Sequence, residues 1–406
     1  MKKRLITAID VGTTKVSTIV AEVKGSGEVR VIGVGNGPSK GLHKGLVVNI
    51  DEARESIKQS VKKAEQASNL KIDAAYVGVT GRHITSLNNR GVVSITRDDR
   101  IVRTDDLKRV LSSAQSMEVP SDRRLLHVIP RNYAVDGQVG VKNPVGMHGF
   151  RLDVETHVIT AGVTSIQNLV KCIRSIGIDV EDLILEPLAS SEAVLTEEEK
   201  MTGVMLADIG GGTTDVAIFR EGSIWHTSVI PVAGYQLTRD ISLGLGLPFD
   251  VAEEMKRKYG SVMPVYDGKS GSEPPAISQD GHGVSYQDIC DILRARVEEI
   301  LKLVLLEMPN SDYEATVPAG LVLTGGSSNL SGLSVLAHSA LGLPVRVGAP
   351  ASGIQGLTDA LSDPAYSTGV GLLLWGARHE SAPAEAGTGF NSTLRQTVTR
   401  IKRLFN

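Results

Sequence analysis

Polar and apolar residues alternate along the first part of the chain with the two-residue period of β-strands. Residues 5–23 have the pattern of a hairpin, and residues 29–34 continue it as a third strand after a glycine-rich turn. Residues 51–68 then carry apolar side chains at helical spacing, which predicts a helix with Asp51 as its N-cap. Together with a strand over 75–79, these elements predict an α/β unit.

The same pattern returns in the middle of the chain. Residues 204–219 again read as strand, polar turn and strand, so the sequence predicts a duplicated architecture with one such hairpin in each half. Between the halves, residues 82–162 hold β-like segments around one helix at about 104–114. This stretch predicts a small inserted α+β domain, after which a helix over 163–176 resumes the α/β pattern.

Four segments of different character follow in the C-terminal half. Residues 261–285 are rich in Gly, Pro, Ser and Asp, which is typical of an exposed loop, and residues 286–308 have the apolar spacing of a long helix. Residues 378–391 have the composition of a flexible linker. Residues 392–405 predict a terminal helix unlike any before it.

Composition narrows the class of protein. The chain has 406 residues and a formal net charge of −3, which argues against a dedicated nucleic-acid binder. Its 43 glycines indicate many tight turns, and its nine histidines show no metal-binding spacing. Cys172 and Cys290 are expected to be buried thiols of a reducing compartment. No apolar run is long enough for a membrane span, so we expect the body of the protein to be cytoplasmic.

The turn of the first hairpin carries residues suited to a phosphate group. Asp10 ends an apolar strand, and a tight turn after it would expose the backbone amides of Gly12, Thr13 and Thr14 to an anion. Lys15 adds a positive charge, and Asp10 is expected to hold Mg²⁺ through water. Standing alone, the motif would be explained equally well as an ordinary Asx or glycine turn.

The second hairpin repeats this design after Asp208. The residues expected to bind phosphate there are Gly210, Gly211, Gly212, Thr213, Thr214 and Asp215. Two such turns facing each other would clamp a triphosphate from both sides. A third element follows the apolar strand at 321–324 and suits close backbone contact with a nucleoside; its residues are Gly325, Gly326 and Ser327.

In this order the three elements resemble the phosphate-1, phosphate-2 and adenosine loops of the actin, Hsp70 and sugar-kinase superfamily. By that resemblance Asp10 and Asp208 hold Mg²⁺, and Glu186 matches the residue that orients the attacking water. The alternative for Glu186 is a helix-capping acid before a proline. The segment 252–256 is similar to an adenosine-contacting helix, unless it is a solvated helical face. The resemblance therefore adds three residues to the nucleotide site: Gly234, Glu253 and Lys256.

Four further sequence motifs resemble one family of this superfamily in particular, the bacterial cell-division FtsA family. They lie at 41–45, 81–84, 142–146 and 234–241. The resemblance runs over essentially the whole chain except the linker. It implies an actin-like (ribonuclease-H-like) duplicated α/β fold with an inserted small α+β domain, called 1C or SHS2.

The same resemblance divides the chain into actin-like subdomains. We expect 1A over 1–81 and 163–195, 1C over 82–162, 2A over 196–232 and 320–377, 2B over 233–319, a flexible linker over 378–391 and an amphipathic membrane-targeting helix over 392–406.

The terminal helix has the pattern of a membrane-surface helix. Its apolar face consists of Leu394, Val398, Ile401, Leu404 and Phe405. Its flanking basic residues are Arg395, Arg400, Lys402 and Arg403, and the absence of acidic residues from 390 to 406 leaves a charge of +4. A helix docked on its own core would not need this cationic flank. One tail is a marginal anchor, so we expect many tails on one filament to bind anionic lipids by avidity.

The FtsA resemblance also implies a role. It implies an ATP-binding protein that polymerises on the inner face of the cytoplasmic membrane, tethers filaments of the tubulin-like protein FtsZ and recruits later division proteins. The expected partners are the FtsZ C-terminal tail, further copies of the chain, anionic lipids and other division proteins. Arg294 and Arg296 are candidates for contact with an acidic FtsZ peptide, or else solvated surface. ATP hydrolysis is expected to be weak.

Two alternatives stay open. A soluble sugar or metabolite kinase of the same superfamily would use the same two hairpins, but it needs a catalytic base in the cleft and has no use for a cationic tail. A pilus-assembly ATP-binding adaptor has a similar fold without a comparable terminal helix.

Overall fold

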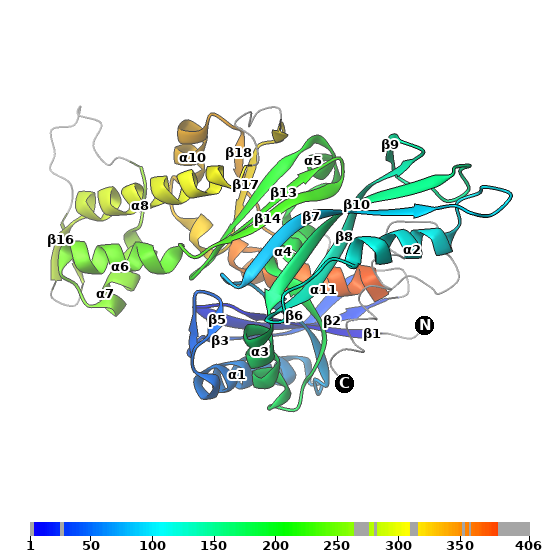
Figure 1. The fold of residues 1–406 in the computed structure, drawn as a ribbon. Coiled ribbons are helices and arrows are strands. Elements are labelled where there is room, and N and C mark those ends of the chain that lie inside the picture. The colour runs from blue at the N-terminus through cyan, green and yellow to red at the C-terminus, as the bar shows by residue number, and fades with distance from the viewer. Residues whose placement is uncertain are drawn as a thin grey trace.

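The computed structural model describes residues 4–24, 28–263, 276–279, 282–308, 316–350, 354–356 and 359–380. Two five-stranded sheets form the centre of the molecule, with an inserted domain on one side and a helical part on the other (Figure 1). The predicted terminal helix at 392–405 lies outside the described residues.

The first sheet has the strand order β11-β6-β1-β2-β3. Its strands are β1 (Arg4–Val11), β2 (Lys15–Val23), β3 (Val29–Pro38), β6 (Ala74–Val79) and β11 (Asp179–Leu185). β2 and β3 are antiparallel neighbours on one side of β1, whereas β6 and β11 run parallel on the other. Helices pack on this sheet from both sides, so its central strand β1 is almost continuously apolar and buried.

The second sheet repeats this arrangement with the order β14-β13-β12-β17-β18. Its strands are β12 (Val204–Ile209), β13 (Thr214–Arg220), β14 (Ser223–Ile230), β17 (Leu321–Thr324) and β18 (Val345–Val347). Again two antiparallel strands lie on one side of the central strand, and two parallel strands lie on the other. The predicted duplication is therefore confirmed.

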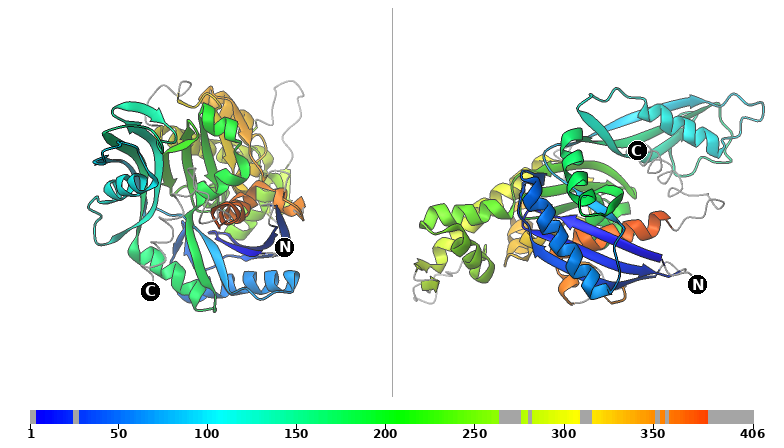
Figure 2. Two further views of the ribbon diagram at one scale, coloured as in Figure 1. Left: turned by 90° about the vertical axis from the view of Figure 1, so that its right-hand side faces the viewer. Right: turned by 90° about the horizontal axis from the view of Figure 1, so that it is seen from below.

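Helices cover the first sheet and connect it to the second. On its outer face lie α1 (Ile50–Ser68) and α3 (Val163–Arg174). Between the two sheets lie α4 (Glu186–Val194) and α11 (Ser367–Glu380), which pack against each other (Figure 2). The short helix α5 (Glu197–Thr202) leads into β12. Because α4 and α11 touch both halves, they fix the two sheets in one structure.

The inserted domain is a four-stranded antiparallel sheet with one helix. Its elements are β7 (Ile84–Ser94), α2 (Thr104–Gln115), β8 (Arg123–Val135), β9 (Gln138–Val141) and β10 (Arg151–Gly162). It has a small apolar core of its own. It docks on the second half through hydrogen bonds at Thr227, whose carbonyl accepts from Ser86 Oγ at 2.8 Å and whose hydroxyl lies 2.9 Å from His157 Nε2.

The remaining described elements are the helices of the helical part, two short hairpins, and α10 and three 3₁₀ turns. They are β4 (Leu42–His43), β5 (Leu46–Val47), α6 (Gly234–Leu245), α7 (Phe249–Tyr259), β15 (Ala276–Gln279), β16 (His282–Ser285), α8 (Tyr286–Leu306) and α10 (Leu333–Leu341), together with the 3₁₀ turns Gly326–Asn329, Asp359–Ser362 and Pro364–Tyr366. The second apolar core of the protein runs from the second sheet into α6, α7 and α8.

Three sequence predictions about these elements are corrected. Asn49, not Asp51, caps α1, because its side-chain oxygen accepts from the amides of Asp51 and Glu52. The segment expected to be an exposed loop contains the β15–β16 hairpin. The start of the predicted linker is still helical, and Arg378 in it forms an ion pair with Glu192 of α4.

Two other predictions concern thiols and membrane spans. Cys172 and Cys290 are free and buried, as expected. Within the described part of the chain, no helix is both long enough and apolar enough to cross a membrane.

Candidate functional site

The turns of the two sheet hairpins meet at the centre of the molecule. The hairpins have matching registers, with Asp10 opposite Ser17 in the first and Asp208 opposite Asp215 in the second. The turns are in direct contact: a Cβ on Gly211 would lie 2.4 Å from Thr14 Cγ2. A Cβ on Gly212 would lie 2.3 Å from Thr13 Oγ1. The two turns can therefore lie this close together only with glycine at these positions. The structure thus brings together the two motifs that the sequence places almost 200 positions apart.

Four buried carboxyl groups surround this contact. They belong to Asp10, Glu186, Asp208 and Asp215. Burial, reinforced by the negative charge of Asp208, raises the pKa of Asp10 to about 6, although Lys15 opposes the shift. Burial and the charges of Asp208 and Asp10 raise the pKa of Asp215 to about 7, against the hydrogen bond from Thr80. Burial also raises the pKa values of Asp208 and Glu186, that of Glu186 well above its ordinary value. The site therefore concentrates negative charge that a cation would offset.

Hydroxyl groups hold two of these carboxylates in place. Ser190 of α4 donates to Asp208 Oδ2, and Thr368 of α11 donates to the same oxygen at 3.1 Å. Thr80, at the end of β6, donates to Asp215 of the second sheet. These hydroxyls come from distant parts of the sequence, and sequence reasoning did not find them. The Thr80–Asp215 bond also links the two halves of the protein directly at the site.

Lys15 places a positive charge at the site. It begins β2, and its Nζ donates to the Ala365 carbonyl at 2.7 Å. Burial lowers the pKa of its ammonium, while the charges of Asp10, Asp363 and Asp208 counteract this shift. A partly buried ammonium whose described hydrogen bond is to a neutral carbonyl is well suited to receive a phosphate oxygen.

The third predicted element lies against the second turn. Gly325 adopts a left-handed conformation with φ of +84°, and a Cβ there would lie 2.3 Å from Asp208 Oδ1. Ser327 Oγ donates to the Gly210 carbonyl at 2.9 Å. The amide of Gly234, at the start of α6, donates to the same carbonyl at 3.1 Å. The backbone of the second turn is thus fixed by the predicted adenosine loop and by α6.

Glu253 and Lys256 on α7 face α6 and are not a solvated face. Lys256 Nζ lies 2.7 Å from Glu253 Oε2, 2.7 Å from Thr238 Oγ1 and 3.2 Å from the Gly234 carbonyl. Thr238 also donates to Glu253. This polar cluster connects α7 to Gly234, and through it to the second turn.

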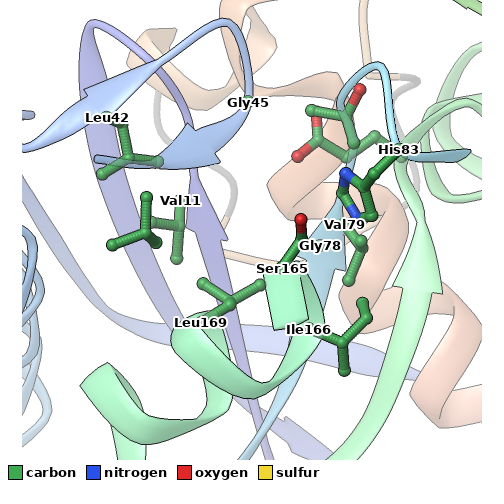
Figure 3. Close-up of a pocket in the computed structure, with 12 residues that line it drawn as sticks. Val11, Leu42, Gly45, Gly78, Val79, His83, Ser165, Ile166 and Leu169 are labelled. Carbon is green, nitrogen blue, oxygen red and sulfur yellow. The ribbon is translucent and has the colours of Figure 1, made fainter. Parts of the chain in front are cut away.

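Glu186 is the first residue of α4, and it lines a small pocket next to the site. No side chain caps α4, and its N-cap position is Leu185, so the role of Glu186 as a capping acid is not supported. Figure 3 shows His83 and Ser165 projecting between β6 and the start of α3. The pocket is lined by Val11, Leu42, Gly45, Val47, Gly78, Val79, Thr80, His83, Ser165, Ile166, Leu169 and Glu186. Water entering this pocket would reach the buried Glu186 carboxyl group.

The donors at the site suit a cation that keeps its water shell. Among the described residues, no three His, Cys, Asp or Glu side chains are grouped so that they could hold a metal ion together. Asp10 and Asp208 are nevertheless buried, adjacent and mutually repulsive. Mg²⁺ commonly binds through one or two carboxylates while retaining several waters and contacting substrate phosphates. These residues fit such an ion.

Arg294 and Arg296 lie elsewhere, on α8 of the helical part. Arg296 forms a two-pronged ion pair with Asp240, at 2.5 and 3.1 Å, and Arg294 Nε lies 3.1 Å from Glu298 Oε1. An acidic peptide would have to compete with these intramolecular partners. Their partner-binding role stays a prediction.

The raised carboxyl pKa values predict the pH dependence of stability without nucleotide. Asp10 and Asp215 ionise near 3.8 in the unfolded chain but near pH 6 and 7 in the folded one, so the folded state binds more protons between these values. The free energy of unfolding is therefore expected to rise as the pH falls from about 8 to about 5. Urea titrations of the nucleotide-free protein across this range provide the measurement. Stability that is flat, or that increases with pH over this window, would contradict it.

Comparison with known proteins identifies the family. A cell division protein FtsA from Pseudomonas aeruginosa is 44% identical over 98% of this chain and 97% of its own length. The chain belongs to the FtsA family of cell division proteins. FtsA of Escherichia coli K12 is 36% identical over 98% of this chain and 97% of its own length. The family model for cell division protein FtsA matches residues 205–371, and that for the SHS2 domain inserted in FtsA matches 81–160.

Solved structures show the fold. The PilM–PilN type IV pilus biogenesis complex matches with a TM-score of 0.64 at 16% identity, covering 92% of this chain and 98% of that one. MreB5 of Spiroplasma citri bound to ADP matches with a TM-score of 0.54 at 15% identity, covering 90% and 94%. The actin-like duplicated fold with an inserted SHS2 domain, expected of an FtsA family member, is confirmed.

Proposed function

We propose that the chain binds ATP with Mg²⁺ between the two hairpin turns. The observation that carries this proposal is the contact between the turns, each preceded by a buried aspartate, with the partly buried Lys15 beside them. Two structures of MreB5 from Spiroplasma citri, which have a similar fold, are bound to ADP and to AMPPNP. The direct contact between the turns implies that they separate slightly to admit phosphate.

Each part of the site has a role in this proposal. The phosphates lie against the amides of the two turns, where Lys15 supplies positive charge and Asp10 and Asp208 bind Mg²⁺ through water. The nucleoside lies near Gly325, Gly326 and Ser327, next to Gly234 and to the Glu253–Lys256 pair that is bonded to α6. Glu186 orients a water for slow hydrolysis, because its buried carboxyl group borders the pocket.

The proposed role of the bound nucleotide is assembly at the membrane. In this proposal residues 392–406 attach the chain to the inner face of the cytoplasmic membrane at the division site, and the attached chains polymerise there. It tethers FtsZ there by a segment of 2B (233–319), with Arg294 and Arg296 as candidate contacts, and recruits later division proteins. The division of the chain into subdomains 1A, 1C, 2A and 2B belongs to the same proposal. Membership of the FtsA family supports this role, and the basic amphipathic sequence of the tail supports the anchor.

Removing the tail is expected to abolish most lipid binding. Four basic residues contribute roughly 1 kcal/mol each at an anionic surface, and the apolar face adds a similar total, against about 2–5 kcal/mol for ordering the segment. A version ending at Ala386 is therefore expected to bind anionic lipid at least tenfold less. The measurement is electron microscopy and sedimentation with Mg-ATP on anionic lipid monolayers and vesicles.

The full chain on purely zwitterionic lipid is the control for charge. Filaments on anionic lipid with the full chain alone support the proposal. If the truncated version binds lipid equally well, the anchor lies elsewhere. If neither version assembles or binds lipid, a soluble kinase of the same superfamily becomes the better explanation, and a screen of phosphoryl acceptors would test it.

A further inference from the structure

One short segment contacts all three predicted nucleotide-binding elements. It comprises residues 363–368, just before and at the start of α11. Asp363 Oδ1 accepts from Asn329 Nδ2 at 2.9 Å, and the Pro364 carbonyl accepts from the Gly325 amide at 3.2 Å. Ala365 accepts from Lys15 and Thr368 donates to Asp208, as described above. The motifs of the sequence did not include this segment.

Tyr366 of this segment covers the Lys15 ammonium. Lys15 Nζ lies 3.3 Å from the centre of the Tyr366 ring, a short cation–π distance. The Tyr366 hydroxyl accepts from Asn36 Nδ2 of β3 at 3.0 Å, so the ring is held at its far end as well. The neighbouring Ala365 carbonyl binds the same ammonium at 2.7 Å. Two adjacent residues therefore hold Nζ, one by its ring face and one by its backbone oxygen.

We propose that Tyr366 is a positioning residue that holds the Lys15 ammonium ready for a phosphate oxygen. A lysine side chain has many rotamers, and fixing it in advance lowers the cost of binding. An ammonium has three donors, so one remains for phosphate when the Ala365 carbonyl and the Tyr366 ring occupy the other two. The phosphate group belongs to the nucleotide, so this role rests on the proposed function.

The experiment is a double-mutant cycle between Tyr366 and Lys15. Affinity for a fluorescent ATP analogue with Mg²⁺ is measured for the full chain, Tyr366→Leu, Lys15→Ala and the double variant. Tyr366→Leu is expected to weaken binding about three- to thirtyfold, the range spanned by cation–π pairs. In the Lys15→Ala background the same change is expected to have no further effect, because the ammonium is already gone.

Two further variants separate positioning from general packing. Tyr366→Phe keeps the ring and is expected to bind within twofold of the full chain. Phe150→Leu removes a comparable pair in the inserted domain, where Arg100 lies 4.8 Å from the Phe150 ring centre, and is expected to leave affinity unchanged. Thermal unfolding shows whether Tyr366→Leu is folded. If it is not, Tyr366→Met, which has an unbranched side chain, is used for the same test.

The outcomes distinguish this role from the proposed function. Failure of the unsubstituted chain to bind the analogue would overturn ATP binding, and this role with it. Normal binding by the full chain together with equal affinity of Tyr366→Leu would overturn the role of Tyr366 alone. So would an equal loss in both Lys15 backgrounds, since it would show that Tyr366 acts by packing and not through the ammonium.

Discussion

Replacing Gly371 with alanine is expected to lower the free energy of unfolding by about 3 kcal/mol, the upper part of the usual range for overpacking. Gly371 lies in α11, where that helix meets α4 backbone to backbone. A Cβ at Gly371 would lie 1.8 Å from the Ala189 carbonyl oxygen and 2.3 Å from its carbon. These atoms belong to a helix backbone and cannot move aside as a side chain could, so the two helices must separate.

Separation of these helices would also disturb the site. α4 carries Glu186 and Ser190, and α11 carries Thr368, which with Ser190 donates to Asp208. We therefore expect Gly371→Ala to weaken nucleotide binding even under conditions where the protein is still folded. If Gly371→Ala binds nucleotide as tightly as the unsubstituted chain, the helices separate without moving the Asp208 carboxylate.

Gly37→Ala is the matched control for this prediction. Gly37 lies in β3, and no atom beyond its chain neighbours lies within 4 Å of a Cβ built there. Its substitution is expected to change stability by less than about 0.5 kcal/mol. Both variants are compared with the full chain by urea unfolding. Equal stabilities for the two variants would refute the close packing of α4 on α11.

The duplicated fold could be predicted from the sequence because its signals are local. Each hairpin is encoded by an alternating pattern and by the glycines of its turn, within about twenty residues. The supporting hydroxyls of the site have no such signal. Thr368 and Asp208 lie 160 positions apart, and Lys15 and Ala365 lie 350 apart. Only the packing of α4 and α11 between the sheets brings these groups together, so Tyr366 and Thr368 look like ordinary helix-start residues in the sequence.

Three predictions about individual segments are wrong, and each has a physical reason within that segment. Asn49 and Asp51 are both good N-cap residues, and the choice depends on which backbone is extended; Asn49 has φ of −139° and ψ of 110°. The β15–β16 hairpin lies in a segment whose composition favours a loop. The composition predicts a linker that starts at 378, but α11 continues to Glu380, and Arg378 forms an ion pair with Glu192 of α4.

Asp10→Asn is expected to have opposite effects on stability and on ligand binding. At pH 8 the folded protein must keep the Asp10 carboxylate ionised although burial raises its pKa to about 6. Asparagine removes this charge at nearly constant volume, so the nucleotide-free variant is expected to be more stable by roughly 1–3 kcal/mol at pH 8. This difference in the free energy of unfolding between Asp10→Asn and the unsubstituted chain should become smaller toward pH 5, where Asp10 itself becomes protonated.

The same substitution removes one of the two proposed Mg²⁺ carboxylates, so affinity for Mg-ATP is expected to fall roughly 10- to 100-fold. Asp105→Asn is the matched control, since it makes the same change of charge at an exposed side chain of the inserted domain. It should alter stability by less than about 0.5 kcal/mol and leave affinity unchanged. Urea unfolding at both pH values and titration with a fluorescent ATP analogue measure the two effects.

A variant that is destabilised at pH 8 would refute the electrostatic account of the buried carboxylates. One that is stabilised but binds Mg-ATP normally would leave that account intact and remove Asp10 from the metal site. The combination of higher stability and lost binding is what a site built to attract a cation should show, because the repulsion among its carboxylates is relieved only when the ligand arrives.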